Sequence, residues 1–197
     1  MKKIKTLFVR DPSNRDRVLP EFADGVSIQG ALPTRKYDGT SCMISDGVLY
    51  KRREVRDGGA CPEDFLAVGH ENGKTQGWVL CQRKDPADHW HFDAFDEMCE
   101  TSTLRDGTYE LCGPKVQGNP EGLHAHALIP HGCTPLFLGD DLGDDAHSVL
   151  NVQSVFDMLS AYLSTAGIEG IVWWLPGCPV AKIKAKDFGF ERTHGQV

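Results

Sequence analysis

Two segments of the chain carry hydrophobic residues at the spacing of an amphipathic helix. In residues 151–165 these positions are Val152, Val155, Phe156, Leu159, Tyr162 and Leu163. Asn151 can cap the start of this segment, and Gly167 can end it. In residues 87–101 the positions are Trp90, Phe92, Ala94, Phe95 and Met98, and the polar face is acidic. We therefore predict helices at 87–101 and 151–165.

Shorter hydrophobic runs bounded by turn residues predict strands. They lie at 4–9, 107–111, 168–175 and 180–186, and a hairpin at 41–53 turns at Asp46-Gly47. Pro176-Gly177 separates the last two strands, and residues 113–132 are rich in Gly, Pro and His, which is typical of a loop with brief strand pieces. This order of elements indicates an α+β fold of antiparallel sheets with flanking helices. The 197 residues show no repeat and no linker, so we expect a single domain over 1–197.

Composition and charge narrow the class of protein. The chain is 40% hydrophobic and 25% charged, with no apolar run long enough to span a membrane and no signal peptide at its start, so we expect a cytoplasmic protein. Its seven cysteines contain no C-x-x-C pair, which favours free thiols in a reducing compartment. The net charge of −7 excludes a broadly basic nucleic-acid binder. Two local basic clusters remain: Lys51, Arg52, Arg53 and Arg56, and Lys182, Lys184 and Lys186.

The stretch RKYDGTS, residues 35–41, poses the question of reactivity. Asp38-Gly39 is a common turn dipeptide, and Lys36 beside it is by itself best explained as a surface lysine. Three later stretches favour a nucleophile instead: YELCG at 109–113, IEGIVWW at 168–174 and VAKIKAKDFG at 180–189.

The three later stretches place charged residues in predicted strands. In YELCG, Glu110 is expected to share a strand face with Thr108 and Cys112. In IEGIVWW, Glu169 starts an apolar strand, where a carboxylate needs a ligand or an ion to meet it. In the last stretch alternate lysines predict one basic strand face, which is either solvated or a clamp for phosphates.

Four short stretches resemble, in order, motifs I, III, IV and V of the covalent nucleotidyltransferases, which comprise ATP-dependent DNA and RNA ligases and mRNA capping enzymes. These stretches are Lys36-Tyr37-Asp38-Gly39, Glu110, Glu169-Gly170 and Lys182-Ile183-Lys184. The segments GTYELCGPKVQGNP and KIKAKDFG are most similar to the small ATP-dependent 5′-3′ RNA ligases. This group includes the vertebrate enzyme and its bacterial and phage relatives. The resemblance runs from about Lys3 to Gly189. It implies the ligase adenylation-domain fold and an RNA ligase that works through a lysyl-AMP intermediate.

The resemblance implies roles for the motif residues. Lys36 corresponds to the lysine that attacks the α-phosphate of ATP and carries AMP, and Gly39 allows a close turn beside the nucleotide. A free lysine has a pKa of about 10.4. Neighbouring cations would favour its neutral, nucleophilic form: Lys182, Lys184 and a bound Mg²⁺ or Mn²⁺.

Further correspondences complete the expected site. Glu110 corresponds to the residue that binds the ribose hydroxyl, and Glu169 to the metal carboxylate, which Asp38 can assist. Lys182 and Lys184 correspond to the catalytic pair that contacts the α-phosphate.

Other positions have weaker matches. Arg52, or Arg53 if the strand register differs by one residue, corresponds to an arginine that contacts the nucleotide sugar or the nucleic acid. Phe137 is our candidate for the ring that stacks on adenine, and a core position is the alternative. Lys186 has no motif role and is expected to meet the phosphate backbone.

Several alternatives stay open. Few residues follow Gly189, so we expect no C-terminal OB-fold, which disfavours capping enzymes and DNA ligases of that plan. The expected substrate is RNA with 5′-phosphate and 3′-hydroxyl ends, bound weakly and in a salt-dependent way by a monomer. A DNA-end ligase or adenylyltransferase, or a non-catalytic nucleotide- or RNA-binding module of the same fold, are the other readings. We do not expect zinc at the loop histidines, which are His124, His126 and His131, with Cys133 nearby.

Overall fold

The computed structural model describes residues 3–101, 105–138 and 151–191, and the chain divides into two compact units. The central unit consists of Lys3 and Asp38–His131, and the terminal unit of Ile4–Tyr37 with the described part of Gly132–Gly195. The chain passes from one unit to the other between Tyr37 and Asp38 and again between His131 and Gly132. Within the described ranges no helix combines the length and the apolar character that a membrane crossing requires.

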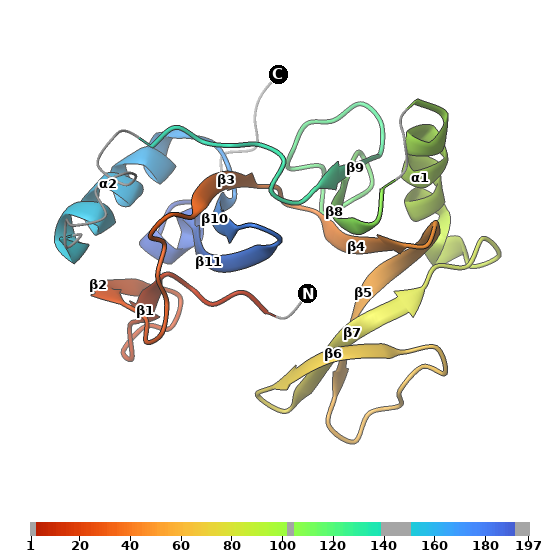
Figure 1. The fold of residues 1–197 in the computed structure, drawn as a ribbon, viewed down its shortest axis with the longest axis horizontal. Coiled ribbons are helices and arrows are strands. Elements are labelled where there is room, and N and C mark those ends of the chain that lie inside the picture. The colour runs from red at the N-terminus through yellow and green to blue at the C-terminus, as the bar shows by residue number, and fades with distance from the viewer. Residues whose placement is uncertain (1–2, 102–104, 139–150, 192–197) are drawn as a thin grey trace. The chain divides into compact units, whose positions relative to one another are not determined.

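The central unit is built on a six-stranded antiparallel sheet in the order β6-β7-β5-β4-β8-β9 (Figure 1). Its strands are β4 (Thr40–Ser45), β5 (Val48–Arg56), β6 (Leu66–Glu71), β7 (Lys74–Leu80), β8 (Gly107–Cys112) and β9 (Ala127–Pro130). A short 3-10 helix, Pro86–Asp88, leads into α1 (His89–Thr101). Ala94 and Phe95 of α1 join a core with Cys42, Ile44, Leu49, Cys81, Tyr109, Leu111, Val116 and Leu128.

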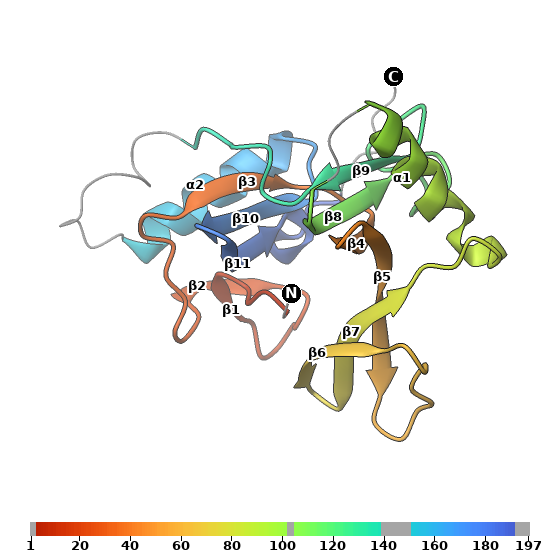
Figure 2. The same ribbon diagram turned by 45° about the vertical axis from the view of Figure 1, so that its right-hand side comes forward.

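The terminal unit contains a three-stranded antiparallel sheet in the order β11-β10-β3 and the two-stranded sheet β1-β2. The strands are β1 (Phe8–Arg10), β2 (Val18–Phe22), β3 (Leu32–Lys36), β10 (Gly170–Leu175) and β11 (Cys178–Lys184), and a 3-10 helix follows at Ala185–Phe188. Figure 2 shows α2 (Val152–Thr165) running alongside the three-stranded sheet. The buried side chains that join them are Val155, Leu159, Leu163, Ile171, Trp173, Ala181 and Ile183.

Most predicted elements are confirmed. Asn151 caps α2 by accepting from the backbone N–H groups of Gln153 and Ser154, as the sequence indicated. The hairpin turns at Asp46 and Gly47, which both have positive φ, 51° and 73°, the requirement of a two-residue type I′ turn. The mainly antiparallel α+β class is also confirmed.

Three details of the prediction were wrong. The strand expected at 4–9 is reduced to Phe8–Arg10, because Lys5 and Leu7 instead form backbone hydrogen bonds with Lys182. The strand expected at 180–186 ends at Lys184. The sequence analysis also missed β2, β3, β6 and β7, although Asn72-Gly73 between the last two has positive φ at both residues and is a strong hairpin signal. Most residues after Gly189, where we expect no OB-fold, lie outside the described ranges.

Candidate active site

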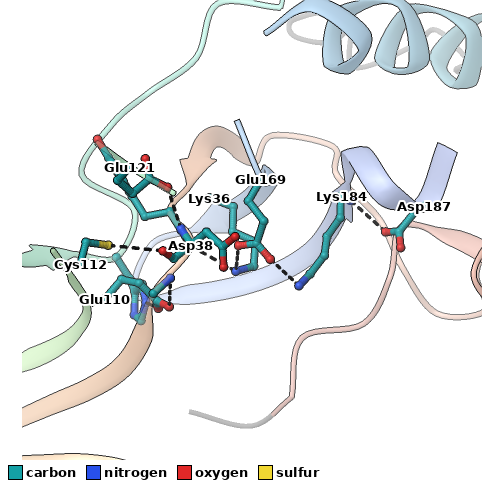
Figure 3. Close-up of polar contacts among 11 residues, drawn as sticks. Lys36, Asp38, Glu110, Cys112, Glu121, Glu169, Lys184 and Asp187 are labelled. Carbon is teal, nitrogen blue, oxygen red and sulfur yellow. Dashed lines mark hydrogen bonds and ion pairs between the residues drawn. The ribbon is translucent and has the colours of Figure 1, made fainter. Parts of the chain in front are cut away.

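Two lysines of the terminal unit contact one carboxylate. Lys36 Nζ lies 2.5 Å from Glu169 Oε2, and Lys184 Nζ forms an ion pair with Glu169 Oε1. Figure 3 shows Glu169 between the two lysines. The three side chains are 13–22% exposed, so the group is mostly shielded but still in contact with solvent.

Strand register brings these residues together. Gly170 of β10 pairs with Lys36 of β3 on one side and with Lys184 of β11 on the other. Because paired residues of adjacent strands point to the same face, both lysines flank the start of β10, where Glu169 lies. The opposite face carries Ile171 and Ile183, which pack in the core. The cluster therefore arises from one row of paired residues across β3, β10 and β11.

Gly170 allows β10 and β11 to approach each other closely in this row. A Cβ atom at this position would lie 2.1 Å from the main-chain oxygen of Ile183 and 2.8 Å from the Cα of Lys184. No side chain fits at such a distance, so only glycine allows β10 and β11 to approach here.

The charges of the lysines determine the state of Glu169. Burial alone would raise the pKa of this carboxyl group, but the charges and hydrogen bonds of Lys36 and Lys184 outweigh burial and lower the pKa below its usual value. Glu169 is therefore a carboxylate at neutral pH. The same contact stabilises Lys36 as an ammonium ion, the form that is not nucleophilic.

The backbone of Lys184 is fixed by a buried aspartate. Asp187 Oδ2 accepts a hydrogen bond from the Lys184 N–H at 2.9 Å, and Asp187 Oδ1 accepts one from Arg10 Nη1 at 2.8 Å. The Asp187 residue is 1% exposed. This arrangement ends β11 at Lys184 and turns the chain into the 3-10 helix.

The other lysines of the basic cluster differ in position. Lys182 projects from the same face of β11 as Lys184, and its backbone is bound on the far side by Lys5 and Leu7. Lys186 lies in the 3-10 helix and is exposed, so it does not extend the strand face as the sequence suggested.

Two aromatic side chains of the terminal unit are relevant to nucleotide binding. Phe137 is 83% exposed, which rules out the core position that was its alternative. An exposed ring of this size is available for stacking. Tyr37 is instead engaged: its hydroxyl lies 3.0 Å from Thr134 Oγ1, and the Arg35 guanidinium lies 4.7 Å from its ring centre.

Glu110 of the central unit is a buried carboxylate with defined partners. Its Oε1 accepts from the Gly39 N–H at 3.1 Å, and its Oε2 lies 2.9 Å from His131 Nε2. The other ring nitrogen of His131 lies 2.9 Å from Thr108 Oγ1. The predicted shared face of Thr108 and Glu110 is thus confirmed. The sequence reading did not identify His131 as a partner of Glu110, because the two are joined only through the pairing of β8 with β9.

Asp38 and Gly39 are held tightly at the start of β4. The Asp38 N–H donates to Glu121 Oε1 at 2.8 Å (Figure 3). A Cβ atom on Gly39 would lie 2.1 Å from the main-chain oxygen of Leu111 and 2.9 Å from Cys112 Sγ. Gly39 is therefore required by the close approach of β4 to β8.

Strand register places Arg52 and Arg53 on different faces of the central sheet. Met43 pairs with both Tyr50 and Thr108, so the face of Glu110 also carries Tyr50 and, two residues on, Arg52. Arg52 lies over the Trp78 ring, 5.0 Å from its centre, and donates to Gln76 Oε1. Arg53 is exposed on the opposite face.

Lys51 does not lie on the basic surface that was predicted from the sequence. Its side chain points to the core face, where its ammonium group lies 2.5 Å from Asp88 Oδ1. Asp88 is fully buried. Arg53 and Arg56 remain exposed in this cluster.

The loop histidines have other partners. His126 Nδ1 lies 2.8 Å from Asp93 Oδ2, and its ring stacks on Trp90 at 4.6 Å. His131 binds Glu110 and Thr108, whereas His124 and Cys133 are exposed. All seven cysteines are free thiols.

Glu169 has the donor chemistry that a hard divalent cation requires. Carboxylate oxygens are the protein ligands that Mg²⁺ and Mn²⁺ prefer. In this structure each oxygen of Glu169 is paired with the ammonium group of a lysine. A cation can bind there only if at least one lysine moves toward another anion.

Comparison with known proteins gives one distant relative. No protein-family model matches the chain. The chain is similar to RNA ligase 1 of Pongo abelii, with 25% identity over 219 residues, which covers 74% of this chain and 63% of the relative. The chain thus spans less than two thirds of that protein's length. This similarity supports a distant relationship to an RNA ligase.

Proposed function

We propose that the chain is an ATP-dependent RNA ligase of the covalent nucleotidyltransferase class and that residues 1–197 are its adenylation domain. The observation that carries the proposal is the pair of ammonium groups, Lys36 and Lys184, on the one partly buried carboxylate of Glu169. A bound anion can exchange with this carboxylate, which frees the lysines for a polyphosphate. The distant similarity to a protein named RNA ligase 1 supports the same class.

Lys36 is the proposed nucleophile. On release from Glu169 it gives its proton to the solvent, and its neutral amine attacks the α-phosphate of ATP. A nitrogen–phosphorus bond forms, the bond to the leaving oxygen breaks, and pyrophosphate departs. The product is lysyl-AMP, a phosphoramidate. The remaining ammonium groups of Lys184 and Lys182 on the same sheet face stabilise negative charge on the α-phosphate.

Glu169 and Asp38 are the proposed ligands of Mg²⁺ or Mn²⁺, which supplies positive charge that neutralises the triphosphate. The nucleotide sugar is proposed to bind Glu110, whose orientation His131 fixes, and Arg52, which lies on the same sheet face. The exposed ring of Phe137 is the proposed stacking partner of adenine.

The second half of the reaction uses the stored adenylate. The 5′-phosphate of an RNA displaces Lys36 and takes up AMP, and a 3′-hydroxyl then attacks that 5′-phosphate and releases AMP. Arg53 and Lys186, which are exposed, are proposed contacts of the RNA backbone together with Arg52.

The test is labelling with α-labelled ATP and Mg²⁺ or Mn²⁺. The expected result is a protein-bound label that survives denaturation and is released by acid. Lys36→Ala should abolish it, whereas the matched control Lys74→Ala, which changes an exposed lysine of β7, should retain it. Absence of label in the wild-type protein, or equal label in Lys36→Ala, contradicts the proposal.

The substrates separate the alternatives. Joining of 5′-phosphorylated RNA but not of DNA supports an RNA ligase, and the reverse supports a DNA-end ligase. Label from GTP in preference to ATP supports a capping-type reaction. Nucleotide binding without a covalent product supports a binding module.

A further inference from the structure

The core face of the central unit contains a second cluster of reactive side chains. Cys81 directly follows β7, Asp88 ends the 3-10 helix at Pro86–Asp88, and His91 lies in the first turn of α1. One possible ligand atom from each of the three lies within 4.8 Å of those of the other two. Their residues are 5%, 0% and 9% exposed. Within the described ranges it is the one such group of three or more metal-ligating residues.

Among the residues that the structure describes, none is a hydrogen-bond partner of either ring nitrogen of His91. A buried polar group without a partner costs about 1–3 kcal/mol, so native proteins rarely keep one. A neutral imidazole has a lone pair on one of its two nitrogens, and at His91 that lone pair is left unused by the described residues. A neutral imidazole with a free lone pair is the form that binds metal ions.

From this geometry we propose that Cys81, Asp88 and His91 form a binding site for a zinc-class divalent ion. Thiolate, carboxylate and imidazole are all zinc ligands, whereas Mg²⁺ requires oxygen donors. Tetrahedral bonds of about 2.0–2.3 Å place ligand atoms roughly 3.3–3.8 Å apart. The distance from His91 Nδ1 to Asp88 Oδ1 is 3.8 Å, so small side-chain rotations complete the site.

In this structure the ammonium group of Lys51 is paired with Asp88, one of the three proposed ligands. Its ammonium group lies 2.5 Å from Asp88 Oδ1 and 3.6 Å from Asp85 Oδ2, while the other Asp88 oxygen accepts from the Gln82 N–H. A divalent ion displaces Lys51 from Asp88 Oδ1. The ammonium can then turn to Asp85, whose side chain is 44% exposed. The thiol of Cys81 gives up its proton to the solvent as the metal–sulfur bond forms.

The site joins the end of β7 to the start of α1. It therefore has a structural role in the central unit and lies apart in sequence from the lysines and Glu169 proposed for catalysis. Its existence does not depend on the proposed ligase activity.

Cobalt titration of the metal-free protein, prepared without an affinity tag, tests the proposal. We expect one equivalent of Co²⁺ to bind with a thiolate-to-metal charge-transfer band, and Zn²⁺ to abolish the band by competition. Cys81→Ser and His91→Gln should each weaken binding at least 100-fold, and Lys51→Met should strengthen it about tenfold, since the competing ammonium is gone.

Matched controls distinguish this site from other thiols and from Glu169. Cys99→Ser and His89→Gln change exposed residues of α1 and should leave the affinity within twofold. Glu169→Gln should retain the band. Circular dichroism establishes that each variant is folded. Absence of the band in folded wild-type protein and in Lys51→Met, or an undiminished band in folded Cys81→Ser, overturns the proposal.

Discussion

Replacing Glu169 by glutamine removes one negative charge from between two ammonium groups and leaves the size of the side chain unchanged. The carboxylate forms one ion pair with Lys36 and another with Lys184. A hydrogen bond to a charged group contributes about 1.5–3 kcal/mol, whereas a fully exposed ion pair contributes at most about 1 kcal/mol. The side chains are 13–22% exposed, and the lysines can turn toward water. We therefore expect a loss of about 2–3 kcal/mol in the free energy of unfolding of the terminal unit at pH 7.

The pH dependence follows from the lowered pKa of Glu169. An unfolded glutamate has a pKa of about 4.3. Because the folded value is lower, the unfolded state takes up protons first as the pH falls. The stabilisation is fully present above the unfolded pKa and is lost as the pH falls through the folded pKa. The difference between wild type and Glu169→Gln should therefore shrink in acid.

Urea denaturation followed by circular dichroism measures both effects, at pH 7 and in steps down to about pH 3. Glu54→Gln is the matched control, because the exposed pair of Glu54 with Lys74 should change the free energy of unfolding by no more than about 0.5 kcal/mol. The reasoning is refuted if Glu169→Gln is as stable as wild type at pH 7, or if its deficit is unchanged in acid.

Three further outcomes are expected. Gly170→Ala should lower the free energy of unfolding by about 3 kcal/mol in urea denaturation, because the new Cβ would lie 2.1 Å from a main-chain oxygen of the adjacent strand; an unchanged midpoint would contradict the close approach. His131→Ala should raise the ATP concentration needed for half-maximal labelling at least tenfold, since it removes the 2.9 Å contact to Glu110, and His131→Gln should restore part of the affinity. Arg52→Ala should slow labelling at least tenfold and Arg53→Ala less than twofold; equal effects would argue against the assignment of faces.

Local sequence signals were sufficient to predict the elements that depend on residues close together in the sequence. The capped, amphipathic helix α2 and the hairpin at Asp46-Gly47 depend on side chains within one short segment. The face shared by Thr108 and Glu110 follows from the period of a single strand. None of these features depends on a tertiary contact.

Other features depend on pairing between distant segments, which a single sequence does not specify. Nothing local to Lys51 distinguishes it from Arg53, yet strand pairing directs it to the buried carboxylate of Asp88. His91 and Cys81 are brought together only because β7 leads into α1 through a short 3-10 helix. The choice between Arg52 and Arg53 likewise required the register of β5 against β4.

The row formed by Lys36, Gly170 and Lys184 makes the terminal unit sensitive to insertions and deletions in a particular way. If one residue were inserted within β10 or β11, the strands would stay paired by hydrogen bonds. One of these positions, however, would then point toward the core. Homologues should therefore accept length changes between Pro176 and Gly177, at the tip of the hairpin, and reject them between Gly170 and Val172. Alignments of distant relatives can be anchored on this gap-free row even where the residues around it have diverged.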